Sequence, residues 1–155
     1  MSGVFGRLSL LMAFAFSLAL DRYEQRRELV ITEANAIETL SSRLIMLPQS
    51  MQKQLRDQLA NYAVTQVTAG LNEDPRRAKV LFATGEAMHD AFGAQLLAGL
   101  AQGPADARTT LLVQAFDAIG DVAAERRAAR AAQLPDPVLV LLLVSCCVTG
   151  AGMLG

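Results

Sequence analysis

The feature that most constrains the fold of this chain is a long helical pattern near its amino terminus. No glycine or proline occurs between Arg7 and Pro48. These residue types most often end a helix, so the 40 residues between them can form one helix about 60 Å long. Apolar residues recur at helical spacing along its second half, which predicts a packed face. The predicted apolar stripe contains Leu29, Val30, Ala34, Ala36, Ile37, Leu40, Leu44 and Leu47.

Three further helices are predicted, over Ser50–Thr68, Arg76–Ala101 and Ala105–Gln133, separated by turns rich in glycine and proline. No β-branched run with a period of two occurs between turn residues, so strands are not expected. The sequence therefore predicts an all-α protein. The residues expected to face inward are Met51, Leu55, Leu59, Tyr62, Gln66, Leu81, Met88, Phe92, Leu96, Leu112, Phe116, Ile119 and Ala123.

Both ends of the chain are apolar, and the charged residues lie between them. Residues 138–155 carry no charged side chain, and these 18 residues would span about 27 Å as a helix, close to the ~30 Å bilayer core. We interpret this segment as a transmembrane helix, because a buried core helix normally has a polar face. Residues 4–20 form a weaker second span, for which the alternative is a cleaved secretory signal peptide.

The basic residues predict how the chain is oriented in the membrane. Between the two apolar segments, three arginines follow the first and three precede the second, whereas the opposite side has only Arg7. Basic residues favour the cytoplasmic side, so residues 21–137 are expected to be cytoplasmic. The expected architecture is two transmembrane helices joined by a helical cytoplasmic bundle. The six arginines are Arg22, Arg26, Arg27, Arg126, Arg127 and Arg130.

The composition excludes several classes of function. The net charge of −1 leaves no dominant basic face, so nucleic acid is not an expected partner. The two cysteines are adjacent and cannot make a disulfide framework. No phosphate loop, nucleophile elbow or catalytic triad is present, so we expect neither an enzyme nor a cofactor. Asp117 and Asp121 lack the co-ligands of a metal site, and the single histidine, His89, is expected at the surface or between helices.

The most distinctive polar residues lie in the long helix, just beyond the expected first span. Glu33 and Asn35 could line an ion path or bind a partner helix, although a solvated or capping role is the simpler interpretation. Ala34 and Ile37 are three positions apart in the sequence and share a helix face with Val30 and Leu44. We expect this face to pack on the fourth helix, with the small Ala34 allowing close approach and Asn35 forming a hydrogen bond across the contact.

The stretch from Leu10 to Ile37 resembles the bestrophin-like bacterial membrane proteins. In that family an apolar span is followed by an arginine pair, a Glu-Ala-Asn-Ala-Ile core, an arginine and a Leu-Pro pair, and later by a basic helix, a proline and a further span. The resemblance singles out Arg26, Arg27, Glu33, Ala34, Asn35, Ala36, Ile37, Thr39, Arg43, Leu47, Pro48, Arg126, Arg127 and Pro135. Two departures are Glu38, where the family tends to have glycine, and the Ser41–Ser42 pair, where it tends to have an aromatic residue and a leucine.

The resemblance implies a multi-pass protein of the bacterial inner membrane and a distant relation to bestrophin anion channels. Family members usually continue through another span, so it also implies that this chain is a C-terminally truncated form. We expect the lipid bilayer and further copies of the chain, or a partner membrane protein, as binding partners. The leading hypothesis is a subunit of an oligomeric anion channel. The alternatives are a non-transporting membrane scaffold or sensor, and a soluble or secreted helical bundle.

Overall fold

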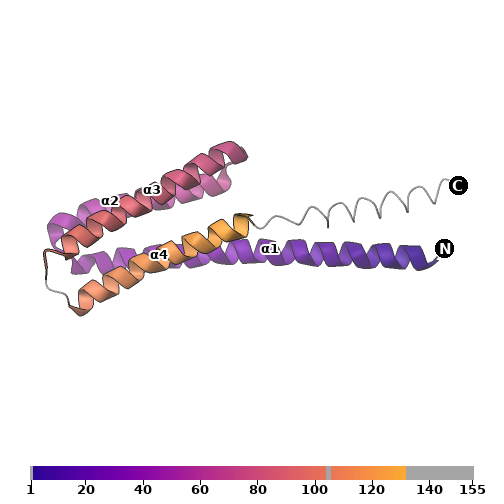
Figure 1. Ribbon diagram of the computed structural model, residues 1–155, viewed down its shortest axis with the longest axis horizontal. Coiled ribbons are helices and arrows are strands. Elements are labelled where there is room, and N and C mark those ends of the chain that lie inside the picture. Colours follow the sequence, from indigo (N-terminus) through magenta and orange to yellow (C-terminus); the bar gives the residue numbers. More distant parts are fainter. Residues whose placement is uncertain (1, 104–105, 132–155) are drawn as a thin grey trace. The chain divides into compact units, whose positions relative to one another are not determined.

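The computed structural model describes residues 2–103 and 106–131. In these residues the protein is all-α, as the sequence predicts (Figure 1). The long helix α1 covers Ser2–Arg43 and is followed by a 3₁₀ turn, Leu44–Met46. Helix α2 covers Gln49–Leu71, α3 covers Pro75–Leu100 and α4 covers Ala107–Ala131. The predicted helices are thereby confirmed, although α1 begins at Ser2, before the predicted Leu8, and ends at Arg43, before the predicted Leu47.

The helix ends follow from local chemistry. Leu47 has extended backbone angles, which the residue before a proline prefers, so the helical path stops before Pro48. Asp74 accepts a hydrogen bond from the Arg76 N–H at 2.9 Å and precedes a proline in the first turn of α3. Asp106 directly precedes α4, and its side chain accepts hydrogen bonds from the N–H groups of Thr109 and Arg108. These bonds hold the pKa of the Asp106 carboxyl below its usual value.

The chain divides into two compact units. The bundle unit is Val30–Ala124, and the end unit combines Met1–Leu29 with Glu125–Gly155. In the bundle unit, α2 and α3 pack against each other in antiparallel order, since Gln58 Nε2 donates to Gln95 Oε1 and Thr65 Oγ1 lies 3.6 Å from Met88 Sδ. Leucines from α1, the 3₁₀ turn, α2, α3 and α4 meet in one apolar core. The fully buried ones are Leu40, Leu44, Leu55, Leu96 and Leu112, beside Ile119.

The register of α1 differs from the expected one. Leu40 and Leu44 are buried and Ile37 packs against the core, but Ala34 and Asn35 are exposed and Val30 is 52% exposed. The prediction that Ala34 packs on another helix and that Asn35 bonds across the contact is therefore wrong. The inward position one turn before Ile37 is occupied by Glu33, which is 3% exposed. The expected solvated role of Glu33 is also wrong.

Among the residues that the structure describes, no helix combines the length and the apolar character needed to cross a bilayer. The span predicted over 4–20 lies on α1 and finds no support there. The uncharged part of α1 between Arg7 and Asp21 has only 13 residues, about 20 Å of helix against a ~30 Å hydrocarbon core. The span predicted over 138–155 lies outside the described residues.

Candidate functional site

Four polar or aromatic side chains form a cluster inside the bundle unit, which we call the core polar cluster: Glu33, Tyr62, Gln66 and His89. Its centre is a hydrogen bond of 2.7 Å that the Tyr62 hydroxyl donates to Glu33 Oε1, where both side chains are buried. A hydrogen bond to a carboxyl group in a water-poor interior is stronger than one at the surface. This bond therefore joins α1 to α2 at a defined register.

Gln66 lies one helical turn beyond Tyr62 and is also buried. It occupies space that a glycine of α3 leaves free, because a Cβ added at Gly85 would lie 2.6 Å from Gln66 Nε2. A larger residue at position 85 would displace the amide. Gly85 thus allows α3 to approach α2 closely enough to enclose the polar cluster.

His89 extends the cluster to α4. Its ring stacks on Phe116, with 4.3 Å between ring centroids and 13° between ring planes, and lies 6.2 Å from the ring of Tyr62. A Cβ added at Gly120 would lie 3.3 Å from His89 Cε1, so this second glycine makes room for the imidazole. The interhelical location predicted for His89 agrees with this position. Its Nε2 atom is buried and makes no hydrogen bond to the described residues.

The interior around the cluster is nearly closed. A cavity of about 10 Å³ lies among Tyr62, His89 and apolar neighbours, which is the space for about one water molecule. No three histidine, cysteine or acidic side chains in the described part of the chain are arranged to bind a metal ion. Within these residues the cluster has no pocket for an organic ligand, and its clear role is to fix how the helices pack.

A second polar contact involves the arginine that the sequence resemblance picks out after the Glu-Ala-Asn-Ala-Ile core. Arg43 Nη1 donates to the carbonyl oxygen of Leu111, at 2.6 Å, and so links the end of α1 to α4. A side chain of α2 stabilises the turn after α1, because Gln52 Nε2 donates to the carbonyl oxygens of Ile45 and Leu47 at 3.2 and 2.7 Å. Glu33 and Arg43 thus fasten α1 to the bundle at two levels.

The other predicted site residues do not join this cluster in the described structure. Arg26 and Arg27 are exposed on the part of α1 that belongs to the end unit. Arg126 is half-buried on α4, where burial and the positive charge of Arg130 lower the pKa of its guanidinium. Ala34 and Asn35 face outward, and Pro135 lies outside the described residues.

Sequence reasoning missed three features: the Glu33–Tyr62 bond, the Arg43 link and the glycines that make room for rings. One signal was present for the first, because Glu33 is spaced four residues from both Leu29 and Ile37 within the apolar stripe. A carboxylate at an inward position of a helix requires a partner. The partner itself could not be read from the pattern, because Tyr62 is 29 residues away in the sequence.

Together, these contacts define an all-α protein whose long first helix is joined to a helical bundle by the buried Glu33–Tyr62 hydrogen bond and by the exposed hydrogen bond from Arg43. Residues 3–155 match the Bestrophin-like domain, which is almost the whole chain. The chain therefore belongs to the bestrophin-like family, and the resemblance stated for Leu10–Ile37 is confirmed. Comparisons with curated proteins and with solved structures gave no match.

The packing of Phe116 against α3 gives a stability prediction. A Cβ added at Gly93 would overlap the Phe116 ring, which is held by stacking on His89 and on Phe92. Gly93→Ala should therefore cost a net of about 0.5–2 kcal/mol of unfolding free energy, after the gain in helix propensity is subtracted from the overpacking penalty. Denaturant titration followed by circular dichroism measures the change.

Gly70→Ala is the matched control. Gly70 also lies in a helix, but no atom lies within 4 Å of the position of an added Cβ. The same chemical change should therefore stabilise the protein there, by up to about 1 kcal/mol. If both variants change the unfolding free energy in the same direction, the result would contradict the close contact between Gly93 and Phe116.

Proposed function

We propose that this chain is a membrane-anchored subunit of an oligomeric anion channel, and that it is neither an enzyme nor a cofactor protein. The observation that carries the proposal is the match of residues 3–155 to the Bestrophin-like domain, because the resemblance to this family implies a distant relation to bestrophin anion channels. The proposal includes the bacterial inner membrane as its location, with residues 21–137 on the cytoplasmic side and no nucleic acid as a partner.

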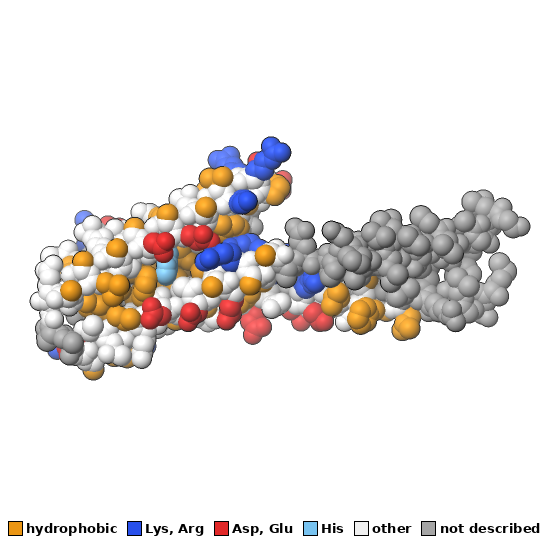
Figure 2. Space-filling model, in the orientation of Figure 1, with side chains coloured by type: hydrophobic (Ala, Val, Ile, Leu, Met, Phe, Trp, Pro, Cys, Tyr) orange, Lys and Arg blue, Asp and Glu red, His pale blue; other side chains and the backbone are white. Residues whose placement is uncertain are grey.

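The exposed side chains of α1 support attachment to a membrane. Five large apolar residues near its beginning are between 46% and 72% exposed, and Figure 2 shows hydrophobic side chains along this part of the helix. Successive residues of a helix are rotated by about 100°, so these side chains point in several directions around it. A helix that is apolar on all sides suits a lipid environment. The residues are Leu10, Met12, Phe14, Phe16 and Leu20.

The second support for membrane attachment is the uncharged run over residues 138–155, which has the length of a bilayer span in the sequence. The two predicted spans therefore belong to the proposal, together with the oligomer. A conduction path would have to lie between copies of the chain, because the two predicted spans of one copy cannot enclose a water path.

The experiment is reconstitution of the purified full chain into lipid vesicles loaded with chloride. Vesicles that contain protein should release chloride faster than empty vesicles after a potassium ionophore sets the membrane potential. Flotation of the same vesicles on a density gradient shows whether the protein is attached to them. Attached protein without chloride release would contradict the channel, and protein that stays at the bottom of the gradient would contradict the membrane anchor.

A second candidate function is a membrane scaffold or sensor that does not transport ions. It is favoured by the core polar cluster, in which the Tyr62 hydroxyl donates to Glu33 across two helices, beside a cavity with room for about one water molecule. Vesicles that bind the protein but show no chloride release would select this candidate.

A further inference from the structure

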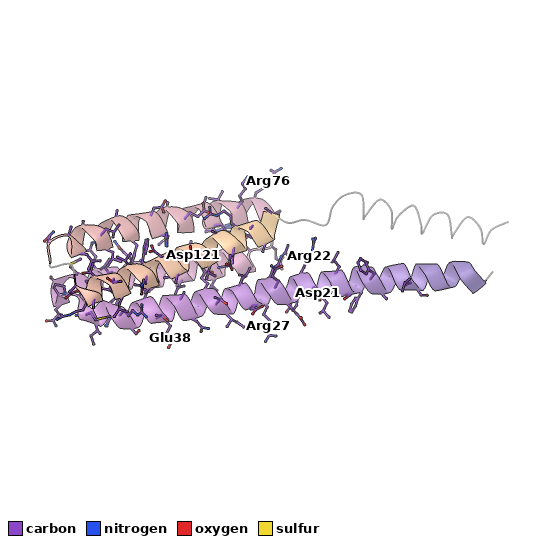
Figure 3. The ribbon with its side chains drawn as sticks, turned by 60° about the horizontal axis from the view of Figure 1, so that its bottom comes forward. Asp21, Arg22, Arg27, Glu38, Arg76 and Asp121 are labelled. Atoms are coloured by element: carbon purple, nitrogen blue, oxygen red, sulfur yellow. The ribbon has the colours of Figure 1, made fainter. Side chains whose placement is uncertain are left out.

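The turn between α2 and α3 combines exposed apolar and basic side chains at one end of the bundle unit. Val67 and Leu71 at the end of α2 are 61% and 79% exposed, and Val80 in α3 is 65% exposed. Three basic residues at the beginning of α3, Arg76, Arg77 and Lys79, are exposed beside them. We call these six residues the hairpin tip. Figure 2 shows basic and hydrophobic side chains together at this end of the hairpin, and Figure 3 shows Arg76 pointing away from the helices.

The hairpin tip lies at the end of the bundle unit where the chain enters at Val30 and leaves at Ala124. Tyr62 on α2 bonds to Glu33, close to that entry, and the remaining turns of α2 continue in the same direction. The opposite end contains the turn at 44–48, near which Met51 contacts Gly99. The hairpin tip and the two connections to the apolar ends of the chain therefore lie on the same side of this unit.

We infer that the hairpin tip contacts the surface of a bilayer that contains anionic lipids, with Leu71 in the interface and the three basic residues at the headgroups. This inference rests on the proposed membrane anchor. Apolar side chains next to basic ones are the pattern of interfacial membrane contacts, and basic residues attract the anionic headgroups of the cytoplasmic leaflet. Two acidic residues, Glu73 and Asp74, lie in the same turn, and Asp74 caps α3. When both are counted with the three basic residues, residues 71–80 have a net charge of +1.

The absence of tryptophan from the sequence gives a direct test, because one introduced tryptophan reports its own surroundings. The full-length Leu71→Trp variant is reconstituted into vesicles of phosphatidylcholine and phosphatidylglycerol whose acyl chains carry bromine, a contact quencher. Ile45→Trp is the control, since Ile45 is 67% exposed but lies at the opposite end of the bundle unit. Tryptophan at position 71 should lose about half of its fluorescence, and tryptophan at position 45 should keep nearly all of it.

A charge variant separates the role of the basic residues. Replacing Arg76, Arg77 and Lys79 by glutamine in the Leu71→Trp protein should restore most of the fluorescence, and so should vesicles made of phosphatidylcholine alone. Equal quenching in both lipid mixtures would contradict the contact with anionic headgroups.

Flotation of each sample distinguishes the failure of this inference from the failure of the proposed anchor. If the Leu71→Trp protein floats with the vesicles but is not quenched, the hairpin tip does not touch lipid, although the anchor stands. A tryptophan with blue-shifted emission but no quenching would show that protein, such as a second copy, covers the tip, and this would also overturn the inference. If the protein does not float, both the anchor and the contact are wrong.

Discussion

Leu40→Ala is expected to lower the unfolding free energy by about 2–5 kcal/mol, because it removes a fully buried side chain and leaves a cavity. Leu40 lies in the apolar core of the bundle unit, against which Ile37, Met51, Met88 and Phe116 also pack. The loss depends on how well these neighbours can close the cavity. Thermal and denaturant unfolding of the full chain in one mild detergent, followed by circular dichroism, would measure it.

Ala34→Leu is the control, because Ala34 lies on the same helix but is exposed. A leucine there should change stability by no more than about 0.5 kcal/mol. The sequence pattern alone predicts a packed Ala34, for which this substitution would cost about 1–3 kcal/mol. The pair of variants therefore tests the register of α1. Loss of stability in Ala34→Leu, together with tolerance of Leu40→Ala, would show that the opposite face is packed.

The period of the apolar residues was sufficient to predict the helices and most of the core. On α2 the spacing of Leu55, Leu59 and Tyr62 selects one face, and all three are buried. Proline 48 and the turn around Pro75 gave the helix ends, because proline limits the residues next to it in any fold. These features depend on residues that are close in the sequence, so they can be derived from the sequence.

The register of α1 could not be derived in the same way. Apolar residues occur on two adjacent faces of this helix, and Val30 and Ile31 are at least half exposed although Val30 belongs to the same predicted stripe as Leu40. The face that packs is decided by the complementary surface of α2, where the Tyr62 hydroxyl requires an acceptor. Contacts of this kind depend on tertiary geometry, which overrides a local pattern when two faces are similar in hydrophobicity.

The exposure of the apolar residues at the beginning of α1 has a different cause from the exposure of Val30. They are spread around the helix and not along one stripe, and they include two phenylalanines more than 65% exposed, Phe14 and Phe16. Large apolar side chains in such numbers normally mark an interaction with lipid or protein. The apolar composition at the beginning of α1 therefore indicates a contact with lipid or protein. The face by which the later part of α1 packs in the bundle unit could not be predicted in this way.

Tyr62→Phe is expected to cost about 1–3 kcal/mol, because it removes a hydrogen-bond donor from the buried carboxyl group of Glu33 while leaving the carboxyl in place. The ring itself is retained, so packing against the core changes little. Tyr23→Phe is the matched control, since Tyr23 is 67% exposed and should change stability by less than about 0.5 kcal/mol. The same unfolding measurements apply to both variants.

A double-mutant cycle then separates the Glu33–Tyr62 bond from the other contacts of each residue. Glu33→Leu alone leaves a buried hydroxyl without its acceptor, whereas Glu33→Leu combined with Tyr62→Phe removes both polar groups. The double variant should therefore be more stable than the sum of the two single losses predicts, by about 0.5–3 kcal/mol. Additive losses would mean that the two side chains do not interact in the folded protein. In that case the core polar cluster does not hold α1 in register, and the exposed position of Ala34 would need another cause.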